Sequence, residues 1–308
     1  EVVTRAEVVR IASDRSLSVR VREPSAGGKG APSEWAPGEH QVHARLVVCA
    51  AGAVGTPALL LRSGLDLPPS LGRGFTCHPA QILVAEHARP ITNDVGHPKS
   101  FFVDRAEEEG FVLETCMYFP FTTAKALTGF GEAHSAMMRA FPRQQQILVL
   151  AVDHAAPDNH VGVDRDGNPI VHYRFSPAAL EGLVRGNRAA ARIFFAGGAV
   201  RVHAPFADPP VVEASHGEPL ERRIHSRNWK AGKQSISAAH LMGGCAMGRH
   251  AGDSVTDAWG RVHDVPWLRV ADAAVFPDAL ESNPYVTIMA LADRVAEGVR
   301  NDVAALLG

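Results

Sequence analysis

The sequence is poor in cysteine and has no strong excess of charge. Its four cysteines, Cys49, Cys77, Cys116 and Cys245, lie far apart and form no C-x-x-C pair, which argues against a disulfide framework or a structural zinc knuckle. The 31 basic and 33 acidic residues leave a formal net charge of −2. Without a dominant charge, nucleic acid and anionic membrane surfaces are poor candidates for binding partners.

Long hydrophobic runs are also missing. The longest apolar stretch, residues 46–61, is interrupted by Gly52, Gly55 and Pro57 and is too short to span a bilayer. No basic and apolar leader opens the chain, which begins with Glu1 rather than Met, so we expect a processed or truncated amino end. With 46% hydrophobic and 21% charged residues in a chain of 308, we expect a soluble protein of one large or two medium domains, with the cytoplasm favoured as its compartment.

The amino-terminal part predicts strands followed by a strand–turn–helix unit. Residues 1–21 alternate apolar and polar side chains, which predicts a β-hairpin or meander, and residues 23–40 are a Gly/Pro/Ser-rich loop. Residues 43–52 predict an almost wholly apolar strand that ends in a turn of small residues. A helix follows over 54–63, with Pro57 in its first turn. Such a unit is typical of parallel sheets that bind nucleotides.

The middle of the chain changes character. Short alternating segments predict an antiparallel sheet flanked by helices, with a hairpin turn at residues 166–168. One clear helix begins at the N-cap Ser176, with Pro177 at its first position. Further on, a strand is predicted over 267–276 and a last helix over 284–307.

This order of elements predicts the fold class and the domains. We expect a mixed α/β fold, in which residues 77–236 form an inserted antiparallel domain. Residues 1–76 and 237–308 are expected to make a partial Rossmann-like domain around it.

Two residues near the carboxyl end are candidates for chemistry. His240 stands among small residues, in the sequence SAAHLMGGCAMG, where the backbone can approach a bulky planar ligand closely. An imidazole with a pKa near neutrality can take or relay a hydroxyl proton. Asn283 is the expected N-cap of the last helix, with Pro284 at its first position. The pair is either an ordinary helix start or a place where free N–H groups face an anionic group.

A metal site is the alternative for the same region. His240, Cys245, His250 and His263 are all possible zinc ligands. Their spacing matches no familiar zinc finger, so no metal site is predicted. Cys245 is expected to be a buried small hydrophobic residue, because no neighbouring cation favours its thiolate.

Three motifs in order carry a resemblance to a known family. Residues 44–64, ARLVVCAAGAVGTPALLLRSG, resemble the second signature of the glucose-methanol-choline (GMC) flavoprotein oxidoreductases. Residues 240–248 and 255–299 resemble the carboxyl-terminal block of that family. The pairing of a histidine in HLMGGC with an asparagine in NPYVTI is similar to the cholesterol-oxidase and long-chain-alcohol branches, whereas the sugar oxidases have two histidines.

The resemblance implies FAD as the cofactor and a role for each matched residue. His240 would be the active-site histidine beside flavin N5 and the substrate hydroxyl, and Asn283 would donate a hydrogen bond to the substrate oxygen. The residues implied to lie along the cofactor are Ala51 and Gly52 at its ADP half, Asp272 at the ribityl chain, and Ala273, Pro284 and Tyr285 at the isoalloxazine ring.

The reaction implied is hydride transfer from the CH–OH group of a small-molecule alcohol to flavin N5. Two alternatives stay open: a hydroxynitrile lyase on the same scaffold, in which the flavin takes no part, and a non-catalytic partner subunit. An apolar alcohol is mildly preferred, because residues 118–131 and 133–141 supply aromatics and methionines. Those side chains either line an apolar pocket or form core, and core is the default expectation.

The sequence departs from the family in one respect. The G-x-G-x-x-G dinucleotide fingerprint is missing; Gly72 and Gly74 lack a third glycine and a following helix. We therefore expect the carboxyl-terminal part of a longer enzyme, or a subunit that needs an amino-terminal FAD-binding partner chain.

Overall fold

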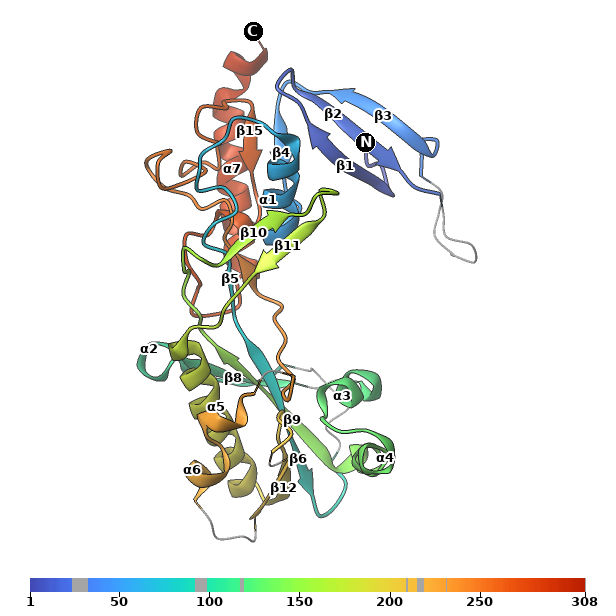
Figure 1. Ribbon diagram of the computed structural model, residues 1–308, viewed down its shortest axis with the longest axis vertical. Helices are drawn as coiled ribbons and strands as arrows, with labels where there is room; N and C mark the ends of the chain where they lie inside the picture. Colours follow the sequence, from blue (N-terminus) through green and yellow to red (C-terminus); the bar gives the residue numbers. More distant parts are fainter. Residues whose placement is uncertain are drawn as a thin grey trace.

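The computed structural model describes residues 1–23, 33–91, 99–116, 119–208, 210–214, 219–230 and 232–307. The elements form an elongated molecule of two lobes, and both termini lie in the same lobe (Figure 1). Several sheets and helices are combined, so the predicted mixed α/β class is confirmed.

The first lobe carries an antiparallel sheet at its edge. β1 (Ala6–Ile11), β2 (Ser16–Val21) and β3 (Gly38–His43) pair in that order. The predicted meander is present, but β3 takes the end of the predicted 23–40 loop, because its backbone pairs with β2 along its whole length. Residues 24–32 of that loop lie outside the described part of the chain.

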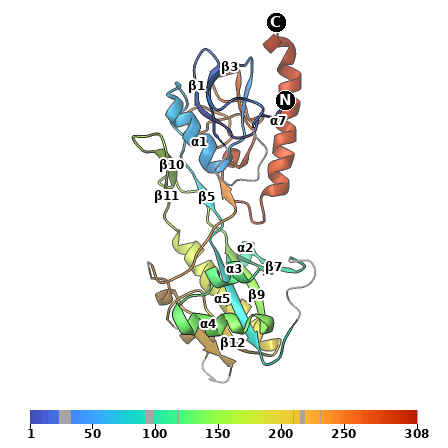
Figure 2. The same cartoon turned by 90° about the vertical axis from the view of Figure 1, so that its right-hand side faces the viewer.

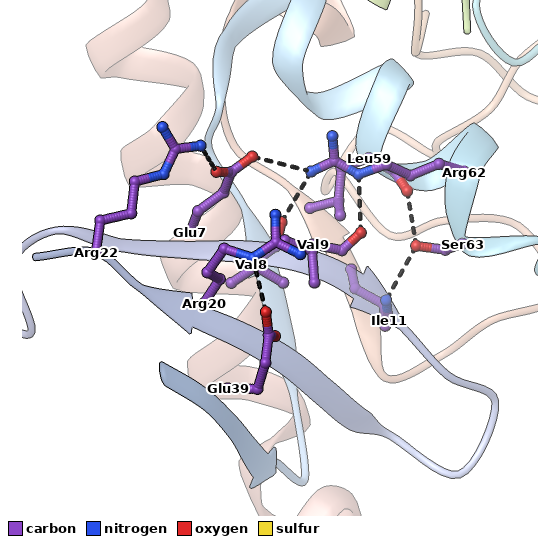
Figure 3. A network of polar contacts seen from close by, with 10 residues as sticks. All are labelled: Glu7, Val8, Val9, Ile11, Arg20, Arg22, Glu39, Leu59, Arg62 and Ser63. Atoms are coloured by element: carbon purple, nitrogen blue, oxygen red, sulfur yellow. Dashed lines mark hydrogen bonds and ion pairs between the residues drawn. The ribbon is translucent and has the colours of Figure 1, made fainter. Parts of the chain in front are cut away.

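Polar contacts fasten this sheet to α1 (Gly52–Ser63). The guanidinium group of Arg62 donates to the carbonyl oxygen of Val9 at 2.8 Å, and the hydroxyl of Ser63 accepts the amide of Ile11 at 3.0 Å (Figure 3). Since Arg62 and Ser63 end α1, they hold the carboxyl end of the helix against β1.

A parallel strand pair forms the centre of this lobe. β4 (Val47–Cys49) and β15 (Leu268–Val270) lie between α1 and α7 (Tyr285–Leu307), as Figures 1 and 2 show. β15 is shorter than predicted, because the chain turns after it into the 3₁₀ helix η4 (Ala273–Val275), which Asp272 caps. The core consists of buried apolar side chains that include Ile11, Val47, Leu60, Val255, Leu268 and Val270.

The second lobe is built on a wholly antiparallel sheet. α5 (Pro177–Ala196) packs on one face of this sheet and shares its apolar core. The Ser176 hydroxyl accepts the amide of Ala179 at 3.0 Å, which confirms the predicted N-cap. In order across the sheet, the strands are β13 (Val211–Glu213), β12 (Ala199–His203), β6 (Ala80–His87), β9 (Gln144–Ala151), β8 (Phe111–Cys116) and β7 (Phe102–Arg105).

The second lobe also contains several short helices. Phe119, Phe121 and Phe130 are 76%, 83% and 91% exposed, so the default expectation that this aromatic region forms core is wrong for them. They begin or precede helices at the outside of the lobe (Figure 1). The short helices are α2 (Ala106–Glu109), α3 (Pro120–Ala126), α4 (Gly131–Arg139), α6 (Leu220–Arg223), η1 (Phe141–Arg143) and η3 (Ser226–Asn228).

Two pairings concern the junction of the lobes. The predicted hairpin is present as β10 (His160–Val163) and β11 (Pro169–His172), and it packs on α1 in the first lobe. β5 (Thr76–Cys77) pairs with β14 (Leu241–Met242) where the chain passes between the lobes (Figures 1 and 2).

The domain division at residues 76 and 236 stays a prediction. Among the described helices, none has the length and apolarity needed to cross a bilayer.

Candidate active site

His240 and Asn283 lie side by side at the junction of the lobes. The Asn283 Nδ2 atom is 3.2 Å from His240 Nε2, although 43 residues separate them in the sequence. His240 directly precedes β14, and Asn283 lies two residues before α7. Both side chains are half-buried. The helix α7 begins at Tyr285, and the amide of Ile288 donates to the carbonyl oxygen of Pro284 at 2.8 Å. The helix therefore starts one residue later than predicted, with Pro284 rather than Asn283 at the N-cap position.

A second histidine, His78, which no predicted motif includes, touches the first. His78 Nδ1 is 3.0 Å from His240 Nδ1, and the two rings meet edge to face with centroids 5.1 Å apart. The other nitrogen of His78, Nε2, is 2.6 Å from the carbonyl oxygen of Leu280. His78 is 2% exposed. The one local signal was a histidine in front of Pro79 and a buried strand.

Both imidazoles are neutral near pH 7. Burial lowers the pKa of His240 to about 4, and the neighbouring His78 adds to this effect. Burial also lowers the pKa of His78, against the opposing influence of the Leu280 carbonyl. A neutral imidazole keeps one lone pair, so His240 is able to accept a proton at physiological pH.

The candidate cofactor residue Asp272 is held by protein donors. Its Oδ2 atom accepts the amide of Gly52 at 2.9 Å and the hydroxyl of Thr56 at 2.5 Å, and its Oδ1 atom accepts the amide of Ala274 at 2.7 Å. A carboxylate at the first amide of a helix stabilises that helix end. Asp272 therefore caps both α1 and η4, and α1 begins two residues earlier than predicted. Ala51 is exposed beside this contact.

The remaining candidate cofactor residues differ in their exposure. Ala273 is buried, and its carbonyl oxygen accepts the amide of Gly243 at 3.0 Å. Pro284 is buried and Tyr285 is exposed. The structure thus brings the small-residue loop after His240 onto η4, whereas the start of α7 faces outward.

An open groove adjoins Asn283. It has a volume of about 460 Å³ and combines apolar side chains with charged ones. The pair of Lys99 and Glu114, whose Nζ and Oε2 atoms are 2.5 Å apart, forms part of its wall. Its lining also includes Phe101, Phe102, Asp104, Val112, Glu281, Ser282 and Tyr285.

The structure gives the possible zinc ligands other surroundings. His240 contacts His78, and His263 Nε2 lies 3.0 Å from the hydroxyl of Ser254. Cys245 is fully buried, and burial raises the pKa of its thiol, as expected for an inert residue. In the described part of the chain, no cluster of three or more His, Cys, Asp or Glu side chains is arranged to hold a metal ion.

Family models match two parts of the chain. A model described as GMC oxidoreductase, for the carboxyl-terminal part of the family, matches residues 157–292, and the amino-terminal model of the same description matches residues 1–80. The second match covers residues 1–80 alone, so the expected need for an amino-terminal partner chain stays a prediction. The chain spans about half the length of the curated relatives it matches.

Curated relatives carry the same family description. An uncharacterized GMC-type oxidoreductase of Mycobacterium tuberculosis is 31% identical over 302 residues, covering 96% of this chain and 45% of the relative. A long-chain-alcohol oxidase of Arabidopsis thaliana is 28% identical over 286 residues, covering 83% of this chain and 36% of the relative. These relatives do not support the hydroxynitrile-lyase alternative.

Solved structures share the fold. Pyridoxine 4-oxidase from Mesorbium loti superposes with a TM-score of 0.65 at 19% identity, covering 96% of this chain and 57% of that structure. A variant of formate oxidase from Aspergillus oryzae gives a TM-score of 0.68 at 14% identity, covering 98% and 61%. The GMC proteins and these neighbours are FAD-binding flavoproteins. With matches at both its ends and related sequences along its length, this chain belongs to the GMC oxidoreductase family.

Proposed function

We propose that this chain carries the catalytic pair of an FAD-dependent oxidoreductase that acts on the CH–OH group of an alcohol. The observation that carries the proposal is the 3.2 Å contact between His240 Nε2 and Asn283 Nδ2 at the edge of an open groove. A base and an amide at one point are what a substrate hydroxyl needs, one to take its proton and the other to fix its oxygen.

The residues present fit FAD in two places. Gly52 has a φ of +81°, and the space where a Cβ would stand is open, so the backbone at the α1 start admits close approach of a ligand. At the start of α7, Tyr285, Val286 and Met289 are exposed apolar side chains beside Asn283, which is a surface suited to a flat aromatic ring. Ala51, Asp272, Ala273 and Pro284 complete the proposed cofactor-binding set.

The chain's own residues would handle the proton and the orientation. FAD, when bound, supplies the hydride acceptor. His240 Nε2 would take the hydroxyl proton as the alcohol carbon is oxidised. The Asn283 amide would donate to the substrate oxygen and hold the C–H bond in one direction. The half-buried setting of both groups would strengthen these hydrogen bonds by excluding water.

The substrate is proposed as an alcohol with an apolar portion. The apolar part of the groove wall, Phe101, Phe102 and Val112, supports this choice. One relative is a long-chain-alcohol oxidase, whereas another is 6'''-hydroxyparomomycin C oxidase of Streptomyces lividus, which is 26% identical over 282 residues. A panel of alkanols and amino sugars therefore tests the substrate class.

Anaerobic flavin reduction tests the function. The intact protein, loaded with FAD, is expected to lose its visible flavin absorption when an alcohol of the panel is added. His240→Ala should keep the bound flavin spectrum but reduce it about 10²–10⁴-fold more slowly, because the proton acceptor is gone. If the flavin in His240→Ala is reduced as fast as in the wild type, the assignment of His240 as the proton acceptor is ruled out. A mass spectrum of the purified flavoprotein reports whether a second chain accompanies it.

A further inference from the structure

An unbroken chain of hydrogen bonds runs through the two histidines. It links Asn283 Nδ2 to His240 Nε2 at 3.2 Å, His240 Nδ1 to His78 Nδ1 at 3.0 Å, and His78 Nε2 to the Leu280 carbonyl oxygen at 2.6 Å. Both ends of the chain, Leu280 and Asn283, belong to the segment between η4 and α7. His78 comes from a different strand connection, 162 residues before His240.

The Leu280 carbonyl sets the direction of every bond in this chain. A carbonyl oxygen only accepts, so His78 Nε2 must carry a hydrogen. A neutral imidazole has one N–H, which leaves the lone pair of His78 on Nδ1, facing His240. His240 Nδ1 must then be the donor between the two rings, and its lone pair is left on Nε2, where the Asn283 amide donates to it.

We propose that His78 is a positioning residue that holds His240 in its Nδ1–H tautomer, so that the Nε2 lone pair faces Asn283, which lines the groove. The inference rests on the proposed function for its role in the reaction, but the tautomer itself is a property of the protein alone. In the opposite tautomer, the lone pairs of His240 Nδ1 and His78 Nδ1 would face each other at 3.0 Å within the protein.

The backbone explains why His78 stays in place. In the antiparallel pairing of β5 with β14, Cys77 lies opposite Leu241, so the next residue pair in this register is His78 with His240. On the far side of the two histidines, Ala80 and Ser237 exchange both backbone hydrogen bonds, at 2.8 and 3.0 Å. The pair is thus fixed from both sides.

Charged neighbours do not replace this control. Glu114 and Lys99 are the charged groups that act on His240, and they affect its pKa in opposite directions. They are paired with each other at 2.5 Å. In the described part of the chain, the imidazole nitrogens of His240 have His78 and Asn283 as hydrogen-bond partners. The contacts of His78 with Nδ1 and of Asn283 with Nε2 both favour the Nδ1–H tautomer by hydrogen bonding.

Long-range ¹H–¹⁵N spectra of ¹⁵N-histidine-labelled protein test the proposal. This measurement needs neither FAD nor substrate. Near pH 7, His240 is expected to show a protonated Nδ1 and a bare Nε2, and His78 the reverse; the His240 signals are identified by their loss in His240→Ala. A wild-type His240 that is protonated on Nε2, or that exchanges equally between tautomers, would overturn the proposal.

Two variants of His78 separate positioning from packing. His78→Asn keeps an acceptor toward His240 and a donor toward Leu280, so the His240 tautomer and most of kcat should be retained. His78→Leu removes both groups; His240 should become a tautomer mixture, and kcat should fall about tenfold or more with KM little changed. Equal loss of kcat in both variants with an unchanged tautomer would show a structural role and refute the proposal.

The outcomes also separate this inference from the proposed function. If His78→Leu does not fold, the wild-type spectrum and His78→Asn still decide the tautomer. If the wild-type tautomer is as expected but no alcohol reduces the flavin, the proposed function fails and the assignment of His78 to the tautomer stands.

Discussion

At the scale of single residues, the two members of the proposed catalytic pair depend on each other. The Asn283 amide donates to the Nε2 atom that would act as the base. A neutral donor at this position stabilises the neutral imidazole, in the same direction as the burial that lowers the pKa of His240 to about 4. The low pKa keeps the base unprotonated over the whole physiological range.

A charge at position 283 should therefore move the pH profile. In Asn283→Asp, a carboxylate stands about where the amide lies, 3.2 Å from Nε2, and raises the pKa of His240 because it favours the imidazolium. Below the raised pKa, His240 is protonated and unable to accept a proton, so the acid limb of the kcat/KM profile should shift to higher pH.

The control for this prediction is the uncharged Asn283→Leu. It removes the amide without adding charge, so kcat should fall while the acid limb moves less than in Asn283→Asp. Stopped-flow flavin reduction between about pH 3 and about pH 9, a range that includes the wild-type His240 pKa of about 4, measures both. An acid limb at the wild-type position in Asn283→Asp would show that His240 is not the titrating base.

At the scale of elements, α5 packs closely on its sheet through two glycines. A methyl group at Gly182 would overlap the carbonyl oxygen of Gly110, and one at Gly186 would lie 2.5 Å from Val149 Cγ1. Helix propensity alone favours alanine over glycine by about 1 kcal/mol. Whether a glycine-to-alanine substitution raises or lowers the free energy of unfolding therefore depends on the contact that the added methyl group makes.

Gly182→Ala should destabilise the second lobe. The obstacle is backbone, which yields less than a flexible side chain, and overpacking of this kind costs about 1–3 kcal/mol. Urea unfolding followed by far-ultraviolet circular dichroism gives the change in midpoint. Gly252→Ala is the matched control, because a Cβ there meets nothing within 4 Å. A midpoint in Gly182→Ala equal to that of the control would contradict the close packing of α5.

Elements with a strong local pattern could be predicted from the sequence. The Ser176–Pro177 start of α5 and the β10–β11 hairpin are set by residues within a few positions. β3 was missed because its side chains carry little apolar pattern and its pairing with β2 defines it. β15 was predicted too long. The strand ends where the side chain of Asp272 caps η4, and the same side chain also accepts the amide of Gly52, which is distant in the sequence.

The residues of the candidate site also differ in whether the sequence predicts them. His240 and Asn283 belong to motifs that resemble a family, so their proximity could be expected. His78 has no such motif around it in the sequence analysis, and its contact with His240 follows from the long-range pairing of β5 with β14. Long-range strand pairing is the step that single-sequence patterns do not contain.

At the scale of the whole molecule, the site lies where the lobes meet. His78 stands at the start of the connection into the second lobe, His240 at the end of the connection back, and Asn283 in the first lobe. The groove beside Asn283 takes its wall from β7 and β8 of the second lobe. The wall of the groove and the proposed catalytic pair thus lie largely on different elements, which allows the wall to vary without moving the histidine pair.

Buried histidines should also set the stability of the molecule in weak acid. Burial lowers the pKa of His78, His203 and His240 below the ordinary value of 6.5. In the unfolded chain these groups bind protons below about pH 6.5, whereas the folded protein binds them only at lower pH, near 4 for His240. Their contribution is therefore fully present above pH 6.5 and is lost as the pH falls through this window.

Thermal unfolding at pH 7.5 and 5.5 tests this at about one unit on either side of the ordinary histidine pKa. The midpoint should fall on acidification, and the fall should be smaller in His203→Gln, because one proton uptake linked to unfolding is removed. His43→Gln, at an exposed position, should leave the fall unchanged. Equal pH dependence in wild type and His203→Gln would mean that the protons bound on unfolding come from groups other than the buried imidazoles.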